Sequence, residues 1–268
     1  MIQALLFDLD DTLYTENEFA LSGYRAVARE AAARGECEYE TAYDCMQTTF
    51  SVVSRKEVFP RLLARFPGLN MTLDDMVRVY REHVPEISLY PGYRSLLEEL
   101  GKNYRLGMIT DGLPYVQRGK VSALGIEGLF EKIIYSWDYG EERQKPHLYP
   151  FALMLETFRI EPQSALFVGD NPEKDGIGAQ EAGMIYVRVA HPGMENNKTL
   201  PWERGRPRRR IINEIGLDIS RPDIGNGRRP RLFIDAGGDD CAPTADYFVI
   251  ESLLQLPDML LQLPRILK

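Results

Sequence analysis

The chain has 268 residues, of which 44% are hydrophobic and 27% are charged, a balance typical of globular proteins and not of disordered chains. Its formal net charge of −8 argues against binding nucleic acid with its whole surface, because the phosphate backbone attracts positively charged proteins. The charge is unevenly spread. Nine arginines and three acidic residues give residues 204–231 a local charge of +6, so the rest of the chain carries −14.

The cysteines and the N-terminal residues indicate the compartment. Cys37, Cys45 and Cys241 form no CxxC pair, so neither a disulfide framework nor a cysteine zinc site is expected. The N-terminus lacks the basic and long apolar regions of a signal peptide. No stretch reaches the ~20 apolar residues that cross a bilayer. We therefore expect a cytoplasmic protein without a membrane segment.

The first element is a short apolar run at residues 2–7, typical of a buried strand in a parallel sheet. Helical patterning follows. One helical segment is expected over residues 45–66, with a break or kink at Pro60. In a later helix, Thr72 and Asp75 form a predicted capping box. That helix would place one apolar face on Met76, Val77, Tyr80, Val84 and Ile87.

After Tyr90-Pro91-Gly92 the pattern changes to strands alternating with helices, which predicts a parallel α/β sheet with right-handed crossovers. The predicted strands are 105–109, 132–135, 165–168 and 185–189. The predicted helices are 93–100, 115–124, 150–158 and 177–182. We expect a Rossmann-like parallel sheet with an α-helical domain inserted after the first strand.

Residues 191–243 interrupt this alternation, because they are rich in Pro, Gly, Arg and Asn. We interpret them as an insertion near the last strand, with a short helix at 211–215 and a strand at 231–235. A strand at 245–250 and a helix at 252–263 complete the chain. The predicted domains are a core of residues 1–14 and 91–268, which includes the insertion, and a helical cap of residues 15–90.

Polar residues follow the carboxyl ends of the predicted strands. Asp8 and Asp10 follow the first strand, Thr110 the second, and Asp170 the fourth, with Asp175 five residues later. Lys145 lies beyond the third. Ligands of open parallel sheets bind at this edge. Clustered carboxylates need a cation to remain ionised, and Mg²⁺ prefers oxygen ligands and phosphate. The three histidines have no metal-binding spacing: His83, His147 and His191.

Such a set is suited to phosphoryl transfer. A carboxylate can attack phosphorus to form an aspartyl-phosphate, and a second carboxylate two residues away can protonate the leaving oxygen and later activate water. The hydroxyl of Thr110, the ammonium of Lys145 and the metal would stabilise the charge on the phosphoryl oxygens.

Four segments resemble the motifs of the haloacid dehalogenase superfamily, in the same order along the chain. They are Phe7-Asp8-Leu9-Asp10-Asp11-Thr12-Leu13, Ile109-Thr110-Asp111-Gly112, Lys145-Pro146, and Val168-Gly169-Asp170 with Asn171 to Asp175. The helical insert resembles a C1-type cap. The resemblance covers about residues 1–190 and resumes near Ala245.

The resemblance implies a role for each matching residue. Asp8 would be the nucleophile and a Mg²⁺ ligand, and Asp10 the general acid and base, with its carbonyl on the metal. Thr110 and Lys145 would hold the phosphoryl oxygens, and Asp111 and Gly112 would also bind the substrate. Asp170 would bind Mg²⁺ directly, and Asp175 directly or through water. Dehalogenases lack a carboxylate at the position of Asp10, so its presence favours phosphoryl chemistry.

The resemblance therefore implies a Mg²⁺-dependent phosphatase acting on a small phosphorylated metabolite. Two alternatives remain open: a phosphomutase that uses the same aspartate pair, and a non-enzymatic scaffold that binds through the Arg-rich insertion. For that insertion, three interpretations are open: a solvated loop, a contact with the cap or in a homo-oligomer through Arg–carboxylate pairs, and a polyanion site. Nucleic acid is the least favoured, because few aromatic residues accompany the arginines. The chain reads Lys145-Pro146-His147-Leu148 where family members often have Lys-Pro-Asp-Pro.

Overall fold

The computed structural model describes residues 1–35, 37–191, 231–233 and 247–266. The chain divides into two compact units. The larger unit comprises Met1–Leu13, Tyr90–Pro114 and Ile126–Lys268, and the smaller comprises Tyr14–Leu89 with Tyr115–Gly125. Each unit is described by itself.

The larger unit contains a seven-stranded sheet in the order β3-β2-β1-β4-β5-β7-β6. Six strands are parallel, and β6 pairs with β7 in the antiparallel direction at one edge. The strands are β1 Ala4–Phe7, β2 Arg105–Thr110, β3 Lys132–Tyr135, β4 Ala165–Gly169, β5 Ile185–Val189, β6 Arg231–Phe233 and β7 Tyr247–Ile250. The predicted Rossmann-like α/β sheet is confirmed.

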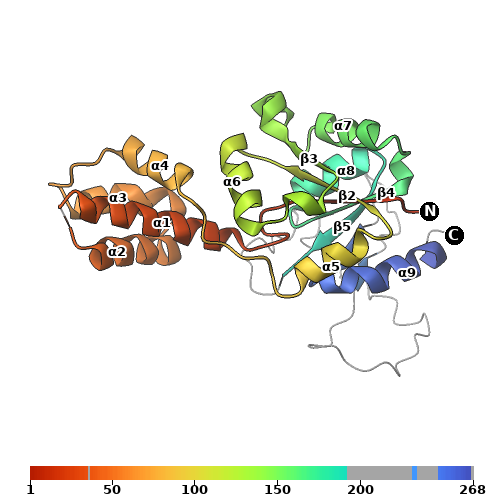
Figure 1. Ribbon diagram of the computed structural model, residues 1–268, viewed down its shortest axis with the longest axis horizontal. Coiled ribbons are helices and arrows are strands. Elements are labelled where there is room, and N and C mark those ends of the chain that lie inside the picture. Colours follow the sequence, from red (N-terminus) through yellow and green to blue (C-terminus); the bar gives the residue numbers. More distant parts are fainter. Residues whose placement is uncertain (36, 192–230, 234–246, 267–268) are drawn as a thin grey trace, which may run out of the picture. The chain divides into compact units, whose positions relative to one another are not determined.

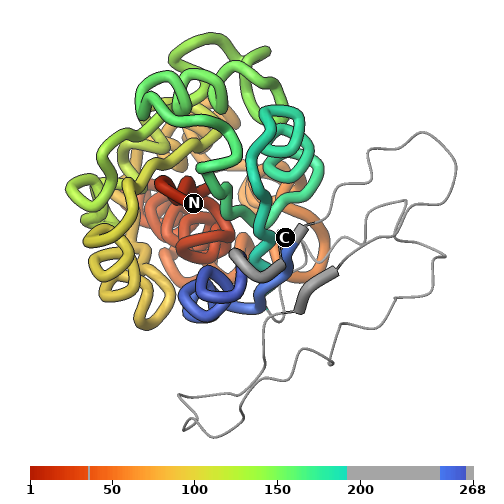
Figure 2. Tube along the Cα trace, turned by 90° about the vertical axis from the view of Figure 1, so that its right-hand side faces the viewer, coloured from red at the N-terminus to blue at the C-terminus, as the bar shows by residue number. Residues whose placement is uncertain are grey.

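The first strand occupies the middle of this sheet. All four residues of β1 are fully buried, as expected for a parallel strand covered on both faces. Ala4 is level with Arg105 of β2 on one side and with Ala165 of β4 on the other. Figure 2 shows the N-terminal end between the segments that carry β2 and β4. This register brings the carboxyl ends of three neighbouring strands to one edge.

Helices cover both faces of the sheet. Figure 1 shows α7 and α8 on one side and α5 and α9 on the other. Phe151 and Met154 of α7 pack with Leu6 and Phe167 in the core beneath the first pair. These helices are α5 Tyr93–Leu100, α7 Leu148–Phe158, α8 Ile177–Glu181 and α9 Leu256–Ile266, with a π-helical turn at Pro172–Gly176 before α8; α6, Pro114–Leu124, begins in this unit and lies mostly in the smaller one.

The smaller unit is helical. Its helices are α1 Glu16–Ala33, α2 Tyr39–Val52, α3 Val58–Arg65 and α4 Leu73–Glu82, together with most of α6. Tyr24, Met46, Leu62 and Met76 are among the buried side chains of its core. The predicted capping box is confirmed, because the Thr72 hydroxyl accepts from Asp75 N while the Asp75 carboxylate accepts from Thr72 N.

Two helix predictions in this unit were wrong. The break in the segment 45–66 falls after Val52, and Pro60 lies in the first turn of α3, where its missing N–H removes no helical hydrogen bond. The apolar face assigned to α4 is shorter than expected, because the helix ends at Glu82. Val84 then lies beyond the helix and is 85% exposed.

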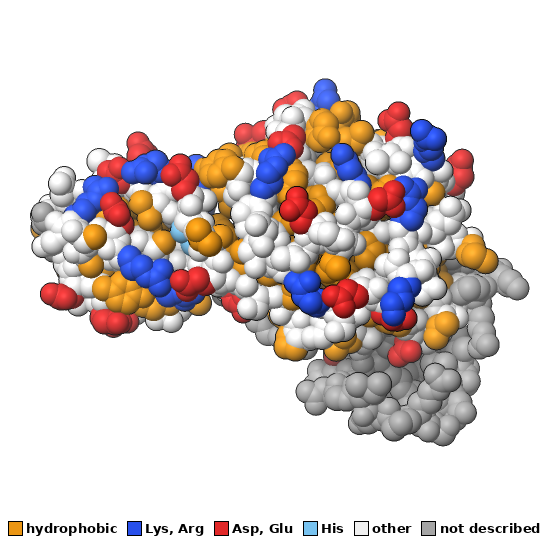
Figure 3. All heavy atoms as spheres, in the orientation of Figure 1, with side chains coloured by type: hydrophobic (Ala, Val, Ile, Leu, Met, Phe, Trp, Pro, Cys, Tyr) orange, Lys and Arg blue, Asp and Glu red, His pale blue; other side chains and the backbone are white. Residues whose placement is uncertain are grey.

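The Arg-rich insertion falls largely outside the described residues, and so does the helix predicted at 211–215. Within it the structure describes β6, which overlaps the strand predicted at 231–235. Among the described helices, none is long and apolar enough to cross a membrane. On the face in Figure 3, basic and acidic side chains of the described residues are interspersed and form no single basic patch.

Candidate active site

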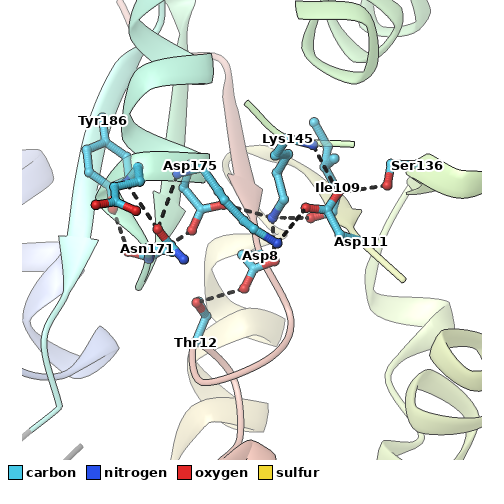
Figure 4. Close-up of polar contacts among 12 residues, drawn as sticks. Asp8, Thr12, Ile109, Asp111, Ser136, Lys145, Asn171, Asp175 and Tyr186 are labelled. Carbon is cyan, nitrogen blue, oxygen red and sulfur yellow. Dashed lines mark hydrogen bonds and ion pairs between the residues drawn. The ribbon is translucent and has the colours of Figure 1, made fainter. Parts of the chain in front are cut away.

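The carboxyl ends of three adjacent strands, β2, β1 and β4, carry Thr110, Asp8 and Asp170. These strands neighbour one another in the sheet, so the predicted residues from distant parts of the sequence converge. Thr110 is fully buried, and Asp8 and Asp170 are 6% and 8% exposed. Lys145 reaches the same place from the loop between β3 and α7, as Figure 4 shows.

Lys145 is the cation of this group, and its side chain is only 2% exposed. Its ammonium Nζ lies 2.5 Å from Asp8 Oδ1 and 2.8 Å from Asp175 Oδ1, and it donates to the carbonyl of Ile109 at 3.1 Å. The contacts with Asp8 and with the carbonyl of Ile109 are hydrogen bonds, and the contact with Asp175 is an ion pair. Lys145 therefore offsets the charges of the nucleophile candidate and of Asp175 together.

The carboxylates of Asp8, Asp170 and Asp175 form one buried cluster. One oxygen of each lies within 4.8 Å of the others. Burial raises the pKa of Asp8 to about 7, against the lowering effect of Lys145, and the charges of Asp175 and Asp10 raise it further. Burial and the neighbouring carboxylates Asp175 and Asp8 also raise the pKa of Asp170 well above its ordinary value. Such a cluster favours protons or a cation.

The turn after β4 holds Asp175 in place. Asp175 Oδ2 accepts from Asn171 N at 3.0 Å, and the side chain of Asn171 accepts from the backbone N–H groups of Glu173 and Lys174. A Cβ atom on Gly169 would lie 2.3 Å from Asp175 Oδ2, so the close approach of this carboxylate requires glycine there. Asn171 thus acts as the cap of the following turn.

Asp111, which was predicted to bind the substrate, accepts hydrogen bonds from other residues of the protein. Its Oδ1 accepts from the Ser136 hydroxyl at 2.7 Å and from Lys145 N at 3.2 Å, while Lys174 Nζ lies 3.8 Å from Oδ2 (Figure 4). The carboxylate therefore positions the backbone of Lys145. Gly112 follows with φ +115°, a conformation that favours glycine. Ser136 was not predicted, although it follows the carboxyl end of β3 directly.

The departure from Lys-Pro-Asp-Pro has a local explanation. His147 lies at the N-cap of α7, and its Nδ1 accepts from Tyr149 N at 3.0 Å. Aspartate caps helices in the same way, by accepting from the second or third backbone N–H. The imidazole of His147 therefore caps α7 at the position where Lys-Pro-Asp-Pro has aspartate.

Comparison with known proteins shows the family of this chain. Residues 5–189 match the family described as haloacid dehalogenase-like hydrolase. The chain belongs to this hydrolase family. A glyceraldehyde 3-phosphate phosphatase of Methanopyrus kandleri is 29% identical over 235 residues, which cover 81% of this chain and all of that protein. The enzyme of the same description from Pyrococcus abyssi is 33% identical over 201 residues, covering 70% of this chain and 81% of its own.

A solved structure has the same fold as this chain. A crystal structure described as an HAD phosphatase from Thermococcus onnurineus has a TM-score of 0.53 and 21% identity. The match covers 97% of this chain and 98% of that chain. At this identity the comparison supports the fold alone.

The donor set of this hydrolase fits a hard divalent cation. The cluster offers carboxylate oxygens only, which suit Mg²⁺ better than softer metals. Asp8 and Asp170 are the residues that would hold the ion, with Asp175 directly or through water. Their raised pKa values mean that a bound cation would relieve the repulsion among buried carboxylates.

We expect the metal-free hydrolase to lose stability as the pH rises from about 4 to about 7. In this window folded Asp8, with its pKa raised to about 7, keeps a proton that the unfolded carboxyl, with an ordinary value of 3.8, has released. The contribution of Asp8 to stability is therefore greatest below the unfolded pKa and falls until the pH passes the folded pKa. Melting temperatures in EDTA between pH 5 and pH 8 would measure this.

Asp8→Asn is the internal reference for that titration, because it removes the ionisable group and leaves the other titrating residues in place. The difference between wild type and Asp8→Asn should widen with pH, in favour of the variant, and Mg²⁺ should stabilise wild type more at pH 8 than at pH 5. A wild-type protein that follows the variant at every pH would show that the pKa of Asp8 is not raised.

Proposed function

We propose that the chain is a Mg²⁺-dependent phosphatase that hydrolyses a small phosphomonoester through an aspartyl-phosphate on Asp8. The observation that carries this is the buried contact of Asp8 and Asp170, at adjacent strand ends, with Asp175 and Lys145 from the following loops, and Asp10 lies two residues from the nucleophile. The phosphatases of Methanopyrus kandleri and Pyrococcus abyssi support the class of reaction.

In the first step, a carboxylate oxygen of Asp8 attacks phosphorus and forms a new O–P bond, while the bond from phosphorus to the ester oxygen breaks. The carboxyl group of Asp10 gives its proton to the departing alkoxide. Asp8 loses its negative charge as the acyl phosphate forms. The ammonium of Lys145, which lies beside Asp8 Oδ1, can then turn a hydrogen bond toward a phosphoryl oxygen.

In the second step, a water molecule attacks phosphorus, and the bond between Asp8 and phosphorus breaks. The carboxylate of Asp10 accepts the proton of that water, so both residues return to their starting states. Thr110 is fully buried at the end of β2 and serves as a hydroxyl donor to the phosphoryl group. When bound, Mg²⁺ would neutralise charge on the phosphoryl oxygens and on the carboxylate cluster.

We also propose that the smaller, helical unit acts as the cap predicted for residues 15–90, and that the site residues have the roles given above. The relatives named for glyceraldehyde 3-phosphate make a short phosphorylated metabolite the first candidate substrate class. The carboxyl group of Asp10 favours phosphate hydrolysis over dehalogenation, because the leaving oxygen of a phosphomonoester needs a proton and dehalogenation has no such leaving oxygen.

The test is phosphate release from a panel of small phosphomonoesters that includes glyceraldehyde 3-phosphate, sugar phosphates and phosphoserine, with Mg²⁺ and with EDTA. We expect turnover of at least one compound with Mg²⁺ and its loss in EDTA. Isomerisation of a sugar phosphate without phosphate release would indicate a phosphomutase instead. Absence of turnover combined with salt-sensitive binding to a polyanion would indicate a scaffold and overturn the proposal.

A further inference from the structure

His191 is a buried histidine that the proposed mechanism does not use. It follows β5 by two residues, belongs to the larger unit, and is 8% exposed. Its Nε2 lies 3.4 Å from the carbonyl oxygen of Thr12 and 3.4 Å from the hydroxyl of Tyr93. Its ring packs against Tyr90, with 4.1 Å between the ring centroids. Three segments distant in sequence are therefore held together at this imidazole.

Thr12 connects His191 to the nucleophile. The residue is fully buried, and its hydroxyl donates to Asp8 Oδ2 at 3.3 Å, as Figure 4 shows. Its backbone N–H donates to the carbonyl of Leu9, which closes the turn after Asp8. Thr12 therefore contacts Asp8 through its side chain and His191 through its carbonyl. Lys145 holds the other carboxylate oxygen, Oδ1.

The partners of His191 also determine which nitrogen carries the proton. A carbonyl oxygen only accepts, so the contact with Thr12 requires a hydrogen on Nε2. The oxygen of Tyr93 accepts from Leu253 N at 2.9 Å, and the Tyr93 proton can point to Ser252 Oγ at 3.3 Å. Burial lowers the pKa of His191. The expected state at neutral pH is thus the uncharged ring with hydrogen on Nε2.

We propose that His191 is a positioning residue for the reaction: its Nε2–H holds the carbonyl of Thr12, and Thr12 in turn fixes the carboxylate of Asp8 for attack on phosphorus. This inference rests on the proposed phosphatase function. His191 does not touch the reacting atoms. Its contribution is to orientation, and displacements of about 1 Å in an attacking group can lower a rate by about 10²-fold.

Two amide variants separate this role from a merely structural one. The side-chain amide of glutamine can place an N–H near the position of Nε2, whereas that of asparagine reaches only the position of Nδ1. We expect His191→Asn to lower kcat by about 10- to 100-fold with little change in KM, and His191→Gln to retain most of the wild-type kcat. Melting temperatures of both variants establish that they are folded.

A double-mutant cycle that combines His191→Asn with Thr12→Val tests whether His191 affects Asp8 through Thr12. If His191 acts through Thr12, then His191→Asn should cost much less in kcat when Thr12 no longer donates to Asp8. If His191→Asn lowers kcat by the same factor in the wild type and in Thr12→Val, His191 does not act through Thr12. A kcat for His191→Asn equal to that of wild type, or a loss in His191→Gln as large as in His191→Asn, would overturn the positioning role itself.

Nitrogen NMR of the imidazole gives a readout that needs no turnover. Wild-type His191 should show a neutral ring protonated on Nε2 at pH 7, and hydrogen on Nδ1 would refute the contact with Thr12. This separates the two proposals. If the wild-type protein hydrolyses no phosphomonoester, the proposed function is wrong. If the wild type is active and His191→Asn has the same kcat, only the inference about His191 is wrong.

Discussion

Asp8→Asn should abolish Mg²⁺-dependent phosphate release, with a loss on the order of 10⁴-fold or more in kcat, because the amide cannot form the acyl phosphate. The substitution changes one atom of a side chain that is 6% exposed, so its shape fits the site. It also removes a buried carboxyl with a raised pKa. The variant should therefore be folded and, without metal, at least as stable as wild type at pH 8.

The matched control is Asp44→Asn, the same chemical change on the exposed surface of α2. It should retain the wild-type rate. Rapid quenching with acid and mass measurement of the intact protein supply a second readout, an increase by one phosphoryl group on wild type that Asp8→Asn lacks. Retention of Mg²⁺-dependent hydrolysis by Asp8→Asn would disprove the covalent mechanism.

The fold was predictable from the sequence because the larger unit follows simple patterns. Fully apolar runs became strands buried on both faces, and the predicted helix Tyr93–Leu100 and strand Lys132–Tyr135 have the observed bounds. The smaller unit was harder to predict. There the end of α2 near Val52 is marked by no glycine or proline, whereas Pro60 can occupy the first turn of a helix.

The site was predictable to the extent that strand ends converge in a parallel sheet. Asp8, Thr110 and Asp170 could be placed together because β1, β2 and β4 are parallel neighbours. The roles of Asp111, Ser136 and His191 could not, because they depend on loops whose paths no periodicity specifies. Asp111 contacts Lys145 across 34 positions, and His191 contacts Thr12 across 179. Such pairs become visible only when the chain is folded.

Lys145→Met should produce the largest loss of stability among the site variants, because the thioether has a similar length but no charge. Lys145 lies within 2.8 Å of both Asp8 and Asp175, and its side chain is 2% exposed. Removing one partner from a buried ion pair costs about 3–5 kcal/mol, since the other charge remains buried. Unfolding by urea in EDTA at pH 8 would measure this loss.

The same variant should recover stability in acid. Lys145 is the group that lowers the pKa values of Asp8 and Asp175, so without it both values rise further, and both carboxyls take up protons when the pH falls. The difference from wild type should therefore shrink between pH 8 and pH 5. Activity with Mg²⁺ should fall by about 10²- to 10³-fold, because the cation beside the phosphoryl oxygens is lost.

The control for the loss of a lysine is Lys102→Met, because Lys102 is 67% exposed and forms an ion pair with Glu99 on the surface of the larger unit. It should change neither activity nor the pH dependence of stability. If Lys145→Met were as stable as wild type at pH 8 in EDTA, the charges of Asp8 and Asp175 would not depend on this lysine. The site would then have to balance its carboxylates by protonation alone, and Lys145 would serve only the phosphoryl group.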